Sequence, residues 1–148
     1  MRVYLRNGMD SPALVLFGEA EKGRINTLYY CPTLEQLFNY FGSPPSNTDG
    51  LYYAIQVILY GKPLLYFRVH EEGVSTEDYL LGLHLLREQN GEIPHVGALF
   101  LPGVGSQAII DEGLLVCREH HGLLLMKESD LYDYLTDYAF LTRGQKST

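Results

Sequence analysis

The chain has 148 residues and a net charge of −7, with 46% hydrophobic and 20% charged residues, a balance typical of one globular domain. An acidic chain gains nothing from counterion release on a nucleic-acid backbone, so we expect no nucleic-acid partner. No run approaches the roughly 18 apolar residues of a membrane span, and residues 1–10 are too polar for a secretory signal, so we expect a cytoplasmic protein with no membrane partner.

The first part of the chain predicts three short apolar strands and then a helix. The strands are expected over residues 2–6, 13–17 and 27–30. Thr33 and Gln36 have the spacing of a capping box, which favours a helix start, and Gly42 is expected to end that helix. One apolar helical face is formed by Leu34, Leu37, Phe38 and Phe41.

Residues 51–60 predict a helix that is apolar nearly all round, since Gln56 is its only strongly polar residue. Such a helix has to be covered on more than one side, and two interpretations stay open: a buried core helix or an interface helix. The chain contains 12 Tyr and no Trp, and tyrosine suits half-buried interface positions. The candidate interface residues are Tyr52, Tyr53, Ile55 and Tyr60.

The second half alternates strands and helices. Strands are expected over 64–69, 96–101 and 123–126, and helices over 75–90 and from Ser106 to 121, with Gly122 in the left-handed C-cap position. Ser129 is expected to cap a last helix with the apolar face Leu131, Tyr134, Leu135 and Tyr138, before a frayed tail over 142–148. This order predicts one domain over 1–148, a three-layer Rossmann-like α/β sandwich whose sheet is mostly parallel and has helices on both faces.

The glycine-rich turn from Pro102 to Ser106 is the most suggestive candidate for a ligand site. It joins a strand to a helix N-terminus, where free amides and the helix dipole favour an anion such as a phosphate. Gly103, Gly105 and Ser106 are the residues of this candidate anion site. The turn lacks both the G-x-G-x-x-G pattern and the lysine of a P-loop, so the alternative is that its glycines serve backbone geometry.

Three further clusters are weighed against ordinary structural roles. The first is a possible acid/base group (His70, Glu71 and Glu72), the second has metal-ligand spacing on a helix (Cys117, His120 and His121), and the third is an acidic helix face (Asp130, Asp133 and Asp137). We interpret them as a solvated turn, a core cysteine with helix-end histidines, and a solvated face. We therefore expect no catalytic residues, no metal and no cofactor, and lean against an enzyme.

The order of motifs over residues 13–126 resembles the core of contractile phage tail-sheath proteins. An apolar strand leads into a Gly-Glu-Ala loop from Gly18, a helix follows that ends in Phe41-Gly42, and a strand ends in Arg68-Val69. A later aliphatic strand runs into Pro102-Gly103 ahead of another helix and strand.

The resemblance implies a non-enzymatic structural or assembly protein that acts through protein–protein contacts, with protein partners or self-association into a homo-oligomer. It implies a reduced relative without the C-terminal domain and the strand-exchanging arms of sheath subunits. The competing hypothesis is a small Rossmann-like domain that binds a phosphorylated small molecule at the turn from Gly103 to Ser106.

Overall fold

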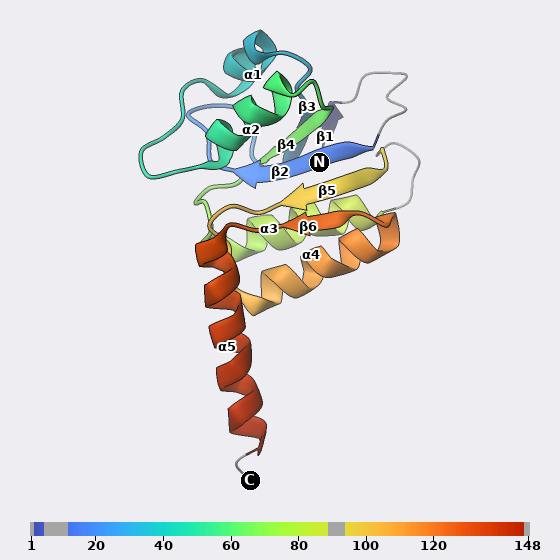
Figure 1. Ribbon diagram of the computed structural model, residues 1–148. Coiled ribbons are helices and arrows are strands. Elements are labelled where there is room, and N and C mark those ends of the chain that lie inside the picture. The colour runs from blue at the N-terminus through green and yellow to red at the C-terminus, as the bar shows by residue number, and fades with distance from the viewer. Residues whose placement is uncertain (1, 5–11, 89–93, 147–148) are drawn as a thin grey trace.

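The sheet has six strands in the order β1-β3-β4-β2-β5-β6 (Figure 1). The computed structural model describes residues 2–4, 12–88 and 94–146, with side chains described for 12–88 and 94–137. The strands are β1 (Arg2–Tyr4), β2 (Ala13–Gly18), β3 (Thr27–Tyr30), β4 (Leu64–Arg68), β5 (Val96–Phe100) and β6 (Leu123–Leu125). Strands β4, β2, β5 and β6 run parallel, whereas β3 is antiparallel to β4 and parallel to β1. The expected mostly parallel sheet is confirmed.

Helices cover both faces of this sheet, as expected for a Rossmann-like α/β sandwich. Helices α1 (Leu34–Phe41) and α2 (Gly50–Leu59) lie on one face, and α3 (Thr76–Arg87) and α4 (Gln107–His120) lie on the other (Figure 1). A fifth helix, α5 (Glu128–Lys146), follows β6 and projects away from the body of the domain. Within the described part of the chain, none of the helices combines the length and apolarity required to span a bilayer.

Alternating side chains of the central strands build two separate hydrophobic cores. Val15 and Phe17 of β2 point toward α3 and α4, and the Phe17 ring lies 4.8 Å from that of Phe67 on β4. Leu16 and Tyr66 belong to the other core, beneath α1 and α2. Both cores are filled by strands without polar interruptions, which is the pattern expected where a sheet is covered on both faces.

Coverage is incomplete over β6. Leu124 packs against the core under α4, but Leu123 is 69% exposed and Leu125 is 37% exposed. Helices α1 and α2 lie over the β3–β4–β2 side of the sheet, and α5 leaves the domain rather than folding back over β6 (Figure 1). The expected helices on both faces are confirmed, and their cover ends at the β6 edge of the sheet.

Several element ends differ from the predicted ones. His121, not Gly122, adopts the left-handed conformation after α4, with φ = 56°. A Cβ at position 122 would lie 2.4 Å from the carbonyl oxygen of Val96, so Gly122 permits a close chain approach instead. Helix α3 stops at Arg87, and the expected Asn90-Gly91 stop lies outside the described residues.

The last helix also differs at both ends. It starts at Glu128, before the predicted cap residue Ser129. It continues to Lys146, although we expected a frayed tail from Thr142. The segment contains no proline, and a single glycine, Gly144, costs a helix only about 1 kcal/mol relative to alanine, which is too little to end it.

Candidate interaction surface

Glu72 holds together the loops at the carboxyl ends of β2 and β4. Its Oε1 accepts hydrogen bonds from the backbone nitrogens of Glu19 and Gly50, each at 3.1 Å, and its Oε2 accepts one from that of Asp49 at 2.6 Å. In return, Oε2 of Glu19 accepts from the backbone nitrogen of Glu72 at 2.8 Å. Because α2 begins at Gly50, Glu72 caps this helix from a distant loop.

The chain crossing beneath this cap leaves no room for side chains. A Cβ on Gly18 would lie 2.9 Å from the Cα of Gly50 and 2.4 Å from the hydroxyl oxygen of Tyr66. That hydroxyl donates to the carbonyl oxygen of Glu19 at 2.8 Å. Burial raises the pKa of Glu72, although the backbone N–H groups that it accepts from act in the opposite direction. The carboxylate of Glu72 is thus occupied by hydrogen bonds from the backbone of its own chain.

The proposed acid/base group is not assembled. The Nδ1 atom of His70 lies 2.7 Å from Oδ2 of Asp78, which also accepts from the backbone nitrogen of His70 at 2.8 Å. Burial alone would raise the pKa of Asp78, but these contacts with His70 outweigh it and leave the pKa lowered. Glu71 is exposed, and Glu72 is committed to α2. The three side chains therefore take separate positions, and the predicted solvated turn is wrong for the half-buried Glu72.

The turn from Gly103 to Ser106 already faces a carboxylate. The backbone nitrogen of Gly103 donates to Oδ2 of Asp130 at 2.8 Å, and a Cβ on Gly105 would lie 2.7 Å from the Cβ of Asp133. Ser106 is exposed at the start of α4. A phosphate bound to the Gly103 amide would have to displace Asp130, and no observation on the described residues favours such a ligand, so the anion site stays a prediction.

Asp130 also departs from the solvated acidic face that we expected. It is 5% exposed, and burial raises its pKa despite the hydrogen bond from Gly103. Asp133 and Asp137 are exposed, as expected for the outer side of α5. The helical spacing alone could not distinguish the buried member of the three, because its partner Gly103 lies 27 positions away.

At the end of α4, Cys117 packs in the core and His120 bonds to the backbone, whereas His121 is exposed. The Nδ1 atom of His120 accepts from the backbone nitrogen of Val96 at 3.1 Å, and its Nε2 donates to the carbonyl oxygen of Leu86 at 2.8 Å. Cys117 is buried, which raises its pKa to about 11. Across the described ranges, no three His, Cys, Asp or Glu side chains come together in a way that could hold a metal ion.

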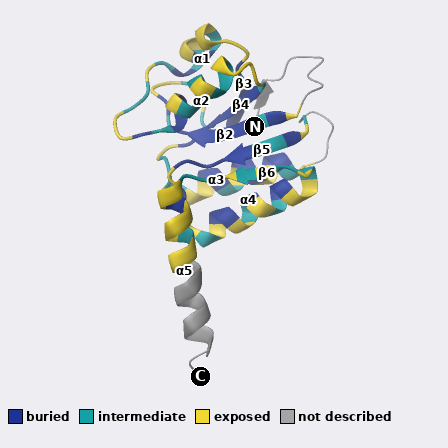
Figure 2. Cartoon of the chain, in the orientation of Figure 1, coloured by how far each residue is buried: buried dark blue, intermediate teal, exposed yellow. Residues whose placement is uncertain are grey.

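Helices α1 and α2 contain exposed residues (Figure 2), and several of these have large apolar side chains. We call this surface the α1–α2 face: Leu34 (40% exposed), Phe38 (60%), Tyr52 (58%), Leu59 (69%) and the half-buried Ile55. Tyr60 (82% exposed) follows the end of α2 and is not part of this face. Leu51 and Ala54 are the buried apolar residues of α2, so the helix is covered on its sheet side only in part. The core interpretation therefore holds for the sheet side of α2, and the interface interpretation stays a prediction for its exposed side.

The four candidate interface residues divide between two sides of α2. Tyr52 and Ile55 lie at i and i+3, on the side of α1, where Ile55 lines a groove. Tyr53 and Tyr60 lie at i and i+7, on the side of β5, where the Tyr53 ring packs 4.6 Å from that of Phe100. The structure therefore does not bring the four residues into one patch.

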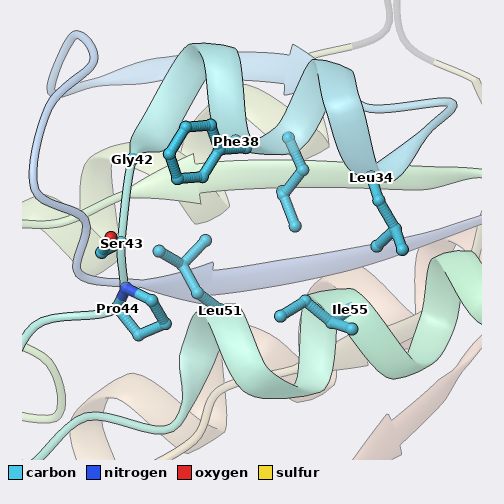
Figure 3. Close-up of a pocket in the computed structure, with 8 residues that line it drawn as sticks. Leu34, Phe38, Gly42, Ser43, Pro44, Leu51 and Ile55 are labelled. Atoms are coloured by element: carbon cyan, nitrogen blue, oxygen red, sulfur yellow. The ribbon is translucent and has the colours of Figure 1, made fainter.

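A groove of about 250 Å³ separates α1 from α2 (Figure 3). Its walls are almost entirely apolar, and Phe38 of α1 lies across from Leu51 of α2 in the close-up. The groove is lined by Leu34, Leu37, Phe38, Gly42, Ser43, Pro44, Leu51 and Ile55. A cleft with this lining can accept apolar side chains but offers few groups that could orient a polar substrate.

Comparison with known proteins yields no relative. No family model matches the chain, and neither the curated proteins nor the solved structures contain a match. Any inference about the function of this protein therefore has to come from its own residues.

Sequence reasoning missed part of this surface. Leu34 and Phe38 were expected on an inward face, but only Leu37 and Phe41 of that set are buried. The apolar face of α1 is wider than the area that the sheet covers, because its four members span both the sheet side and the α2 side of the helix. The apolar residues all round α2 were the sequence signal from which the exposed Leu59 could have been predicted.

Proposed function

We propose that this chain is a non-enzymatic assembly protein that acts through protein–protein contacts made by the α1–α2 face. The observation that supports this function is the groove between α1 and α2, with exposed Phe38, Tyr52 and Leu59 around it. Exposed apolar clusters of this kind in a folded domain are typical of protein interaction sites. The resemblance to tail-sheath cores, carried by the order of motifs, points toward the same class of function.

The energetics favour a covered rather than a solvated face. Fully burying a large apolar side chain is worth about 1.5–3 kcal/mol, so covering the exposed parts of the face offers on the order of 5 kcal/mol before association costs. The polar groups at the strand ends are meanwhile used within the fold: Glu72 caps α2, and Asp78 binds His70. These polar side chains are occupied by hydrogen bonds within the fold, whereas the apolar side chains of the α1–α2 face are exposed. This contrast favours binding of a protein over catalysis.

Site-specific photo-crosslinking tests this function. Benzoylphenylalanine is introduced in place of Phe38, which is 60% exposed, and separately in place of His84, which is exposed on α3 on the opposite face of the sheet. In cells of the native host we expect a protein adduct from position 38 and none of comparable yield from position 84. Equal yields at both positions would overturn the proposal.

A further inference from the structure

Helix α5 extends far beyond the contacts that anchor it. It has 19 residues and therefore a length of about 28 Å. Its described contacts with the body come from its beginning: Asp130 accepts from Gly103, and the Tyr134 hydroxyl lies 3.2 Å from Oδ1 of Asp111. The rest of the helix continues away from the domain (Figure 1). Most of the stability of helices in proteins comes from tertiary packing, so a partner that covers the projecting part of α5 would stabilise it.

The described part of α5 carries an apolar stripe on its outer side. Leu131 is 43% exposed, Tyr132 is 70% exposed and Leu135 is 54% exposed. Leu131 and Leu135 are separated by four positions and lie one above the other on the helix. Asp130 and Tyr134, also four positions apart, face the domain. The helix thus leaves one apolar side without cover from its own chain.

The α1–α2 groove cannot receive this stripe from the same chain. The bond between Gly103 and Asp130 fixes the beginning of α5 at the carboxyl end of β5, and the helix then runs toward the side of α3 and α4. Helices α1 and α2 lie at the opposite end of the molecule (Figure 1). A second copy of this protein carries the same apolar groove and the same projecting helix. Its groove could therefore receive the α5 stripe of the first copy.

The dimensions of the two surfaces match. Helices α1 and α2 have 8 and 10 residues, so the groove between them has walls of about 12–15 Å, roughly the length of two to three helical turns. The groove is lined by leucine, isoleucine, phenylalanine and proline side chains, which suit leucine and tyrosine knobs from a docking helix.

The charges near the groove also permit this contact. Exposed residues at its two ends balance, with Lys22 and Lys62 against Glu21 and Glu35. Helix α5 is acidic, with Asp133 and Asp137 exposed on the side of the helix away from Leu131 and Leu135. In a chain of net charge −7, a locally neutral apolar surface is where an acidic helix meets the least repulsion.

We propose that α5 of one copy docks in the α1–α2 groove of the next copy, which gives a head-to-tail assembly. This inference rests on the proposed function and names its partner. Groove and helix are different surfaces, so each contact leaves a free groove at one end and a free helix at the other. Such heterologous contacts generate a ring when the rotation closes and a filament when it does not.

Complementation between two variants tests the inference. The groove variant is Phe38→Glu, and the helix variant combines Leu131→Glu with Leu135→Glu; all three positions are exposed, so both proteins are expected to fold with an unchanged circular dichroism spectrum. Sedimentation velocity over a wide concentration range should show multimers for the parent protein. Each variant alone should associate with a dissociation constant raised roughly 30-fold or more, the loss typical of a central apolar anchor.

A mixture of the two variants decides the geometry. An intact groove on one variant and an intact α5 on the other should give a 1:1 dimer that does not extend further. Two controls lie off these surfaces and should assemble like the parent protein. Asn39→Glu on α1 adds the same charge as Phe38→Glu, and Asp137→Lys changes the charge by as much as the helix variant does, on the side of α5 away from Leu131 and Leu135.

Other outcomes overturn the inference in distinguishable ways. One outcome is that the helix variant associates like the parent protein and only Phe38→Glu weakens association. The α1–α2 face would then pair with itself, which would refute the head-to-tail contact but support the proposed function. A parent protein that is monomeric at every concentration, with crosslinks from position 38 to another polypeptide, has the same consequence. If neither the variants nor the crosslinks involve the α1–α2 face, both proposals fall.

Discussion

The carboxylate of Glu72 lies 2.6 Å from the backbone nitrogen of Asp49, although 23 positions separate the two residues. The contact joins the loop after β4 to the first turn of α2, and the same carboxylate reaches the end of β2 through the backbone nitrogen of Glu19. Together with the buried Leu51 and Ala54, this half-buried side chain helps to fix the position of α2 on the sheet.

Replacing Glu72 with alanine should destabilise the fold markedly. The change removes the acceptor of three backbone N–H groups, and hydrogen bonds to a charged group are each worth about 1.5–3 kcal/mol. We expect the free energy of unfolding in urea to fall by about 3 kcal/mol. The neighbouring exposed Glu71→Ala is the control, with an expected change within about 0.5 kcal/mol. Similar effects of the two substitutions would contradict the capping role.

The ionisation of Glu72 should also affect stability as the pH changes. Burial raises its pKa in the folded state above the ordinary value of 4.5, so the folded protein holds this proton more tightly than the unfolded chain does. The resulting stabilisation is complete below pH 4.5 and is lost as the pH rises through the raised pKa. Relative to Glu72→Gln, which cannot ionise, the parent protein should therefore lose stability across this window.

This pH effect is measured as the difference in unfolding free energy between parent and Glu72→Gln at a series of pH values. Asp130, whose pKa burial also raises, is present in both proteins and cancels in the difference. A difference that is constant, or that grows in favour of the parent as the pH rises, would show that burial does not dominate at Glu72.

Two glycine-to-alanine substitutions should have opposite results. A Cβ at Gly18 would lie 2.4 Å from the hydroxyl oxygen of Tyr66, so we expect Gly18→Ala to cost about 2 kcal/mol or more through overpacking. A Cβ at Gly113, inside α4, would meet Leu101 and Leu99 at 3.4 Å, so Gly113→Ala should be neutral or stabilising by up to about 1 kcal/mol. Thermal unfolding measures both. Equal tolerance at the two sites would argue against the close crossing of β2 and α2.

Both thiols should be inert in the folded protein. Burial raises the pKa of Cys31 to about 12 and that of Cys117 to about 11, so almost no thiolate is present at neutral pH. We expect negligible reaction of the native protein with a thiol-specific disulfide reagent at pH 8 and two reacting thiols per chain in urea. Rapid labelling of the native protein would mean that one of the two cysteines is accessible.

The regular elements could be predicted because their signals are local. Strand β3 matches its predicted range, and Oγ1 of Thr33 accepts from the backbone nitrogen of Gln36 at 3.1 Å, as a capping box requires. The reciprocal half of that box is absent within the described bonds, since the side chain of Gln36 donates to the hydroxyl of Tyr40 instead. A competing partner one turn away was enough to redirect it.

The parts that sequence reasoning missed depend on distant contacts. Glu72 was interpreted as a member of a solvated turn, because its partners Glu19 and Asp49 are 53 and 23 positions away and leave no local pattern. The surface was predicted in part: the apolar character of α2 indicated an interface, but which of its sides stays open is decided by the position of α1 and by α5 leaving the sheet. Neither position follows from periodicity.

The position of β2 at the centre of the sheet has a consequence for synthesis on the ribosome. Both of its hydrogen-bonded neighbours, β4 and β5, come later in the chain, so this apolar strand emerges with no sheet partner. At translation rates of about 5–20 residues per second, the interval before β4 is complete lasts on the order of seconds. During that interval the apolar side chains of β2 lack the strands that later cover their edges.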